Sequence, residues 1–184
     1  MKRGAVVAAA GRRIDRADAA EARFPPGDIP GTLRRIRDGL VRRAGTTLVT
    51  SAACGADLLA LSAAADLHLR RRVILPFDAQ RFKVTSVTDR PGDWSAVFDR
   101  TILELVSAGD LIVRNESADD SGYAAVGEAI LDEAERIARE HGERLVAMIV
   151  WDGRARPGLD LTALFRESAR RRGFEIEDVP TMSG

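Results

Sequence analysis

The feature of this sequence that most constrains its fold is the alternation of short apolar runs with longer segments of helical periodicity along the whole chain. Several runs are continuously apolar, as expected for strands that are buried on both faces of a sheet. Strands that alternate with helices are typical of a parallel α/β sheet. The predicted strands are Ala5 to Ala10, Thr47 to Thr50, Arg72 to Leu75, Leu111 to Arg114, Leu145 to Trp151 and Phe174 to Val179.

The pattern predicts an α/β fold, a three-layer sandwich with a mainly parallel central sheet. Helices are expected at Thr32 to Arg43, Gly55 to Leu67, Asp93 to Gly109, Gly122 to His141 and Leu161 to Arg172, with Asp93 as an N-cap. A chain of 184 residues has the usual size of one domain. No linker or repeat divides it, so residues 1–184 are predicted to form a single domain.

Two connections between these elements are unusually long. One runs from Gly11 to Gly31 after the first strand, and the other from Phe77 to Gly92 after the third. Structureless connections of this length in a compact domain are usually functional. Both leave the carboxyl ends of strands, where open parallel sheets bind their ligands. A binding site is therefore expected at that end of the sheet.

The composition excludes several classes of function. The chain has 28 basic and 28 acidic side chains, so it lacks the positive charge of a general nucleic-acid binder. One cysteine and two distant histidines (Cys54, His68 and His141) cannot form the usual zinc patterns. No apolar run approaches the length of a membrane span or a secretory signal. We expect a cytoplasmic protein with no metal, no cofactor, no membrane contact and no nucleic-acid partner.

The sharpest local pattern is the run Ser51-Ala52-Ala53-Cys54-Gly55-Ala56-Asp57 between the second strand and an apolar helix. Small side chains let the backbone approach a ligand closely, and free amides at a helix start favour phosphate. Asp57 could then accept a hydrogen bond from a ribose hydroxyl. Alternatively, Asp57 complements the helix dipole and the small residues only permit close packing. The run is neither a P-loop nor a dinucleotide fingerprint.

The first strand is followed by Gly11-Arg12-Arg13-Ile14-Asp15. A glycine beside two guanidinium groups suits a pyrophosphate, because arginine offers planar, bidentate donors. The alternative is that both arginines are ordinary surface residues.

These motifs, together with Leu75-Pro76-Phe77, Arg81-Phe82 and Ser86-Val87, resemble the SLOG superfamily of Rossmann-like domains, which is related to the Smf/DprA and LOG proteins. The resemblance implies a pocket for a nucleotide derivative at the strand ends. Some relatives hydrolyse an N-glycosidic bond, and others sense ADP-ribose-like signals for an effector. The residues expected to bind the ligand are Gly11, Arg12, Arg13, Asp15, Ser51, Ala53, Gly55, Ala56, Asp57, Pro76, Phe77, Phe82 and Tyr123.

The chain departs from two branches of that superfamily. It has no PGGxGTxxE motif, so the glutamate of the phosphoribohydrolases has no counterpart here. The Smf/DprA branch binds single-stranded DNA, whereas this chain has zero net charge and only 5% aromatic residues. Neither branch fits well.

The remaining candidates are single residues. Tyr123 could stack on a base, and Asp119 or Asp120 could hold a ribose, although a solvated loop and helix cap explain the same segment. Glu128, Asp57 and Asp15 are the candidate catalytic acids or bases. Cys54 is interpreted as a packing residue, because no histidine lies near it in the sequence.

The main hypothesis is a nucleotide-binding module without catalytic activity, a sensor in a signalling or defence system. Its expected partners are a small nucleotide ligand, further copies of itself and a separate effector protein. The second hypothesis is a nucleotide hydrolase that cleaves a glycosidic or phosphate bond. The third is a scaffold with a vestigial pocket. An enzyme needs an acid or base within reach of the scissile bond, and no residue in the sequence identifies itself as one.

Overall fold

The computed structural model describes residues 3–182 and contains a six-stranded sheet in which every pair of neighbouring strands is parallel. The strand order is β4-β3-β2-β1-β5-β6, which confirms the predicted α/β class and parallel sheet. The strands are β1 (Ala5–Gly11), β2 (Gly45–Thr50), β3 (Arg70–Leu75), β4 (Leu111–Val113), β5 (Arg144–Trp151) and β6 (Glu175–Pro180).

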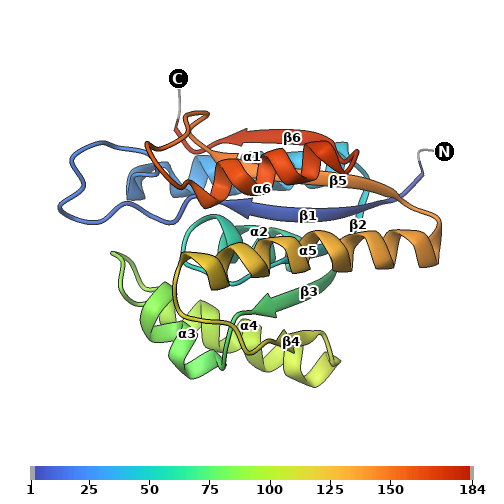
Figure 1. Cartoon of the computed structure of the whole chain (residues 1–184), viewed down its shortest axis with the longest axis horizontal. Helices are drawn as coiled ribbons and strands as arrows, with labels where there is room; N and C mark the ends of the chain where they lie inside the picture. The colour runs from blue at the N-terminus through green and yellow to red at the C-terminus, as the bar shows by residue number, and fades with distance from the viewer. Residues whose placement is uncertain (1–2, 183–184) are drawn as a thin grey trace.

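Helices cover both faces of this sheet. They are α1 (Ile29–Arg42), α2 (Ala56–Asp66), α3 (Ala79–Ser86), α4 (Ser95–Ala108), α5 (Asp120–His141) and α6 (Leu161–Arg171), with one 3-10 turn at Pro26–Asp28. Figure 1 shows α5 and α6 side by side over one face, while α1, α2 and α4 lie over the other. None of the helices within residues 3–182 is long and apolar enough to cross a membrane.

Strand β1 shows how the sequence builds the three layers. Successive side chains of a strand point to opposite faces of the sheet. Val7 and Ala9 accordingly belong to the buried cluster under α1 and α2, whereas Val6 and Ala8 belong to the cluster under α5 and α6. A strand buried on both faces needs apolar residues at every position, which is why β1 has no polar alternation.

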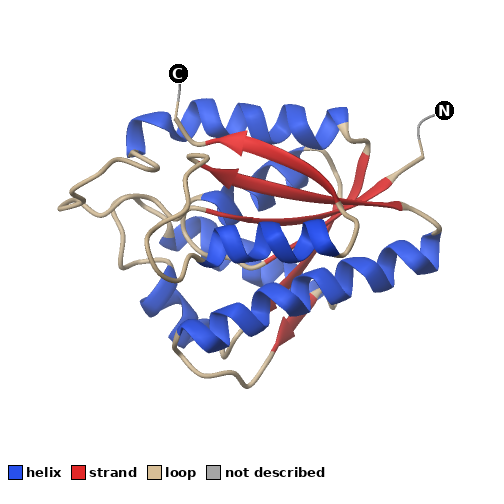
Figure 2. Cartoon of the chain, turned by 45° about the horizontal axis from the view of Figure 1, so that its top comes forward, coloured by secondary structure: helices blue, strands red, loops and turns tan. Residues whose placement is uncertain are grey.

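The order of the strands reverses direction beside β1. The chain adds β2, β3 and β4 on one side of β1 and then returns to place β5 and β6 on the other. Figure 2 shows the strand arrowheads pointing toward the end of the molecule where the long connections gather. Gly11 ends β1, and Gly55 and Pro76 follow β2 and β3, so these three residues lie at the same rim of the sheet. Such a reversal point is the usual place for a ligand crevice.

Several predicted boundaries were wrong. The connection from Phe77 to Gly92 contains helix α3, whose start Asp78 caps by accepting a hydrogen bond from the Arg81 amide at 2.9 Å. Asp93 is not an N-cap, because α4 begins one residue later, after Trp94. The first helix begins at Ile29 rather than Thr32, and α5 begins at Asp120 rather than Gly122. Strands β2 and β3 each begin two residues earlier than predicted.

Arg12 links the first long connection to the segment that follows β5. Its guanidinium group lies 3.0 Å from Asp152 and 2.8 Å from Asp160, and it also donates to the carbonyl of Arg154 at 2.6 Å. The Arg12 side chain is only 3% exposed. Arg23, further along the same connection, contacts the other Asp152 oxygen at 2.9 Å. These contacts hold both sides of the strand-order reversal together.

Arg12→Met is expected to lower the free energy of unfolding by about 3–5 kcal/mol, because it leaves the buried carboxylates without their main partner. Arg13→Met, at the neighbouring and more exposed position, should change it by less than about 1 kcal/mol. Urea denaturation of both variants at pH 7 measures the difference. Equal effects of the two substitutions would contradict a structural role specific to Arg12.

Candidate functional site

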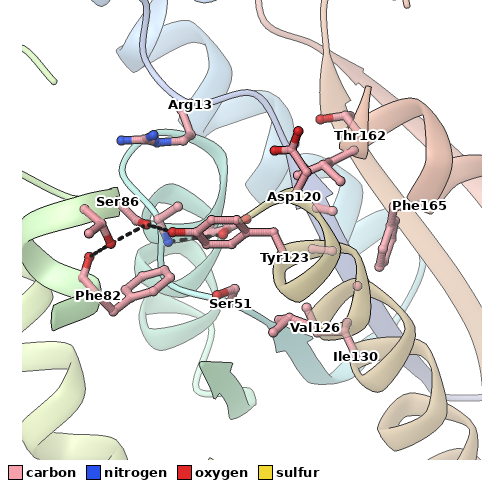
Figure 3. A pocket seen from close by; sticks show the side chains of 18 of the residues that line it. Arg13, Ser51, Phe82, Ser86, Asp120, Tyr123, Val126, Ile130, Thr162 and Phe165 are labelled. Carbon is pink, nitrogen blue, oxygen red and sulfur yellow. Dashed lines mark hydrogen bonds between the residues drawn. The ribbon is translucent and has the colours of Figure 1, made fainter. Parts of the chain in front are cut away.

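A cavity of about 390 Å³ opens at the carboxyl ends of β1 and β2, next to the reversal point. Its volume lies within the range of small-molecule sites. Figure 3 shows that its side chains come from both faces of the sheet. The cavity is lined by Ala9, Ala10, Gly11, Arg13, Ser51, Ala53, Asp57, Phe82, Thr85, Ser86, Arg90, Asp120, Tyr123, Val126, Gly127, Ile130, Arg156, Leu161, Thr162 and Phe165.

Two glycines let the backbone segments around the cavity come close together. A Cβ at Gly11 would lie 2.3 Å from the carbonyl oxygen of Val150 in β5. Gly55 has a φ of +95°, and a Cβ there would lie 2.8 Å from the carbonyl oxygen of Arg12. A side chain would clash at either position, and the φ of Gly55 is one that other residues rarely adopt. The turn before α2 is thereby pressed against the segment that follows β1.

Arg13 and Arg90 form a charged wall of the cavity. Within residues 3–182, the buried side-chain nitrogens and oxygens without a hydrogen-bond partner are the Nε atoms of these two arginines. Burial and the nearby positive charge of Arg13 lower the pKa of Arg90 below its ordinary value. A buried donor without an acceptor is costly, and native structures contain few of them. The wall is therefore short of negative charge and of acceptors.

Asp89 partly neutralises this wall. Its carboxylate forms an ion pair with Arg13, and its second oxygen lies 3.6 Å from the Nε atom of Arg90. Arg90 also donates from Nη1 to the carbonyl of Ile14 at 3.0 Å. These contacts join the two long connections, one following β1 and the other following β3. One carboxylate thus faces two guanidinium groups.

Asp57 lies in the first turn of α2 and lines the same cavity. Burial raises the pKa of its carboxyl group to about 6, although a hydrogen bond from the Ala53 amide opposes the shift. The Ala53 amide lies 3.1 Å from Oδ2 of Asp57. A carboxyl group with this pKa exchanges its proton near neutral pH, which a general acid or base requires.

Tyr123 crosses the cavity from α5 toward α3, as Figure 3 shows. Its hydroxyl lies 3.2 Å from the hydroxyl of Ser86, which lies 3.2 Å from that of Thr85. The ring meets Phe77 edge to face, with centroids 6.3 Å apart. These contacts fix the position of an amphipathic ring in the lining of the cavity.

The opposite wall is mostly apolar, with Thr162 of α6 as a polar residue beside it. It consists of Val126, Gly127 and Ile130 from α5 with Leu161 and Phe165 from α6. Val126, Ile130 and Phe165 are each less than 5% exposed. The cavity therefore has a cationic side and an apolar side, separated by the small residues at the end of β1.

Seven of the thirteen predicted ligand-binding residues line this cavity, and the other six do not. The predicted residues in its lining are Gly11, Arg13, Ser51, Ala53, Asp57, Phe82 and Tyr123. Arg12, Asp15, Gly55, Ala56, Pro76 and Phe77 do not line it. The Arg12 guanidinium group is instead held by Asp152 and Asp160, which turn it away from the cavity.

The remaining residues have structural contacts. Asp15 accepts hydrogen bonds from the Arg23 and Phe24 amides, both at 2.9 Å, and so shapes the first long connection. The Ala56 amide donates to the carbonyl of Arg12 at 3.1 Å. Glu128, a candidate acid, forms an ion pair with Arg172 at 2.5 Å outside the cavity.

Pro76 and Phe77 also lie beside the cavity rather than in it. The Pro76 carbonyl accepts from the Glu116 amide at 2.9 Å, and Phe77 packs against Phe82 with centroids 6.2 Å apart. Cys54 is buried, and burial raises the pKa of its thiol. This agrees with the interpretation of Cys54 as a packing residue. No group of His, Cys, Asp and Glu side chains in the described part of the chain is arranged to hold a metal ion.

The sequence reasoning missed Arg90 and the contribution of α6. Arg90 lies in the second long connection, in which only Phe77 and Phe82 are predicted to bind the ligand. Leu161, Thr162 and Phe165 follow β5, whose carboxyl end lies at the same rim as that of β1. The rule that ligands bind at strand ends could have found them, had it been applied to the fifth strand.

Asp57→Asn is expected to stabilise the protein at pH 8 by about 1–3 kcal/mol and to change stability little at pH 4. The folded pKa of about 6 exceeds the ordinary value of 3.8, so wild-type stability falls as the pH rises through 6. Asparagine cannot ionise but can still accept the Ala53 hydrogen bond. Urea denaturation of both proteins between pH 4 and 8 measures the effect. A difference that does not vary with pH would contradict the raised pKa.

The comparisons with known proteins give a similarity of structure but no family. No protein-family model and no curated protein matches the chain. Its structure is similar to that of DNA processing protein A (DprA) from Streptococcus pneumoniae, with a TM-score of 0.43 and 14% sequence identity. The match covers 95% of this chain and 61% of that one, so this chain spans less than two thirds of its length.

Proposed function

We propose that the cavity binds a phosphorylated nucleotide derivative and that the protein acts as a binding module. The observation that carries this proposal is the pair of arginines, Arg13 and Arg90, whose buried Nε atoms have no acceptor within the described residues. A phosphate offers several strong acceptors and at least one negative charge. A bound phosphate would therefore supply the negative charge and the hydrogen-bond acceptors that Arg13 and Arg90 lack.

The other walls suit the rest of a nucleotide. Asp57 and Asp120 lie in the first turns of α2 and α5, where their carboxylates can accept hydrogen bonds from ribose hydroxyls. Tyr123 and the apolar side provide surfaces for a flat ring. Small apolar sites with a few placed polar groups are typical of ligand pockets.

A role in signalling is the more specific part of the proposal. The ligand would replace part of the contact between Asp89 and Arg13, which joins the two long connections. Binding would therefore change the surface that these connections form. A separate effector protein or another copy of the chain could respond to that change, as in the sensors of the superfamily that the sequence resembles.

A nucleotide hydrolase is the second candidate, and Asp57 is the observation that favours it. Its pKa of about 6 leaves part of the population protonated at neutral pH. A protonated carboxyl group could give its proton to a departing base while water adds to the sugar carbon. We place this second because no partner that would activate the water has been identified.

Arg13→Gln and Arg90→Gln are each expected to weaken nucleotide binding by about 10- to 100-fold, the usual worth of a hydrogen bond between charged groups. Calorimetry with AMP, GMP, UMP, CMP and ADP-ribose measures the effect. Arg37→Gln is the matched control, because Arg37 is exposed on α1 and does not line the cavity. Equal affinity in the control and in both cavity variants would refute the phosphate assignment.

Asp89→Asn should have the opposite effect and strengthen binding severalfold. Asparagine removes the negative charge that competes with the ligand for Arg13 and Arg90. The gain should shrink at 1 M salt, because salt screens charges that are partly exposed. Weaker binding in this variant would mean that Asp89 helps to hold the ligand.

Incubation with AMP, NAD or ADP-ribose is expected to leave these compounds intact. Chromatography that shows release of base or ribose phosphate at about 1 s⁻¹ or faster would favour the hydrolase instead. In that case Asp57→Asn should abolish release and preserve binding.

A further inference from the structure

Gly127 is a glycine that the packing of the protein does not require. It lies in the interior of α5, where glycine is less favourable than alanine because it loses more backbone freedom on folding. A Cβ at this position would meet only Cδ2 of Phe165 within 4 Å, at an ordinary contact distance of 3.5 Å. By contrast, a Cβ at Gly122 in the same helix would lie 1.9 Å from the Ser117 carbonyl oxygen. Alanine would therefore fit at position 127 in the protein alone.

The space left by the missing methyl group belongs to the cavity. Gly127 lines it together with Val126 and Ile130 on α5 and with Leu161 and Phe165 on α6. Figure 3 shows Phe165 across from Val126 and Ile130, on the side of the cavity remote from Arg13. We call these five residues the α5–α6 slot. These five side chains contain no hydrogen-bond donor or acceptor. Thr162 of α6 lines the cavity beside them and carries a hydroxyl group.

We propose that the α5–α6 slot holds the base of the nucleotide and that Gly127 keeps it open for a purine. This inference rests on the proposed function and names the class of ligand. The phosphate would lie at Arg13 and Arg90, the ribose over the small residues that end β1, and the base against Phe165. This replaces Tyr123 as the main surface for the base, since Tyr123 is already fixed by Ser86 and Phe77.

The chemistry of the slot sets its selectivity. Because its side chains offer only apolar surface, it recognises a ring by shape and contact area rather than by hydrogen bonds. A purine has more flat surface than a pyrimidine and so gains more from burial. We therefore expect AMP and GMP to bind severalfold more tightly than UMP and CMP, with little difference between the two purines.

Gly127→Ala tests the slot directly. The variant should melt at the same temperature as the wild type or higher, because alanine favours the helix. Its affinity for AMP and GMP should fall at least tenfold. Ribose 5-phosphate, which has no base, should bind both proteins equally. Gly31→Ala is the matched control, because Gly31 is a helical glycine of α1 that does not line the cavity.

Each outcome decides the proposal. If wild type and Gly127→Ala bind AMP equally, the base does not occupy the slot, although the phosphate assignment survives. Loss of both AMP and ribose 5-phosphate binding in Gly127→Ala would show a general distortion of the site and also overturns the slot. If the wild type binds neither nucleotides nor ribose 5-phosphate, the proposed function fails together with this inference.

Discussion

The buried charges around Arg12 are the interaction on which the rest of the site depends. Arg12 leaves β1 and meets Asp152 and Asp160, which follow β5, the strand beside β1 in the sheet. Burial alone would raise the pKa of Asp160, but hydrogen bonds from Arg12 and the Arg156 and Ala163 amides lower it to about 2. Asp160 also caps α6. One guanidinium group thus fixes the cationic and apolar walls of the cavity relative to each other.

The contrast between Arg12 and Arg13 shows what the sequence could not reveal. Both follow the same strand, and both looked equally suited to a phosphate. Neighbouring residues point in different directions, so one reaches the carboxylates beyond β5 and the other reaches the cavity. The partners of Arg12 lie about 140 positions away in the sequence. No local pattern identifies such partners, because burial and pairing are properties of the folded chain.

The fold was easier to predict than the site. Continuous apolar runs such as that of β1 mark strands buried on both faces, and this signal is local. All six strands were found, although β6 alternates polar and apolar residues. Helix α3 was missed because its eight residues bury only Phe82 and Ser86, too few to give a clear helical period. At the site, the strand-end rule located Gly11, Ser51 and Asp57. The rule does not predict Arg90, because Arg90 follows α3 and is separated from the end of β3 by that helix.

Three features of this cavity make the protein less stable than other residues at the same positions would. Arg13 and Arg90 have buried donors without acceptors, Asp57 is a carboxyl group whose burial raises its pKa, and Gly127 is a glycine where alanine would fit. Each of these lowers the stability of the protein alone. Natural sequences depart from local stability mainly where function demands it. Arginine donors at one end and an open slot at the other fit a ligand that is anionic at one end and flat and apolar at the other.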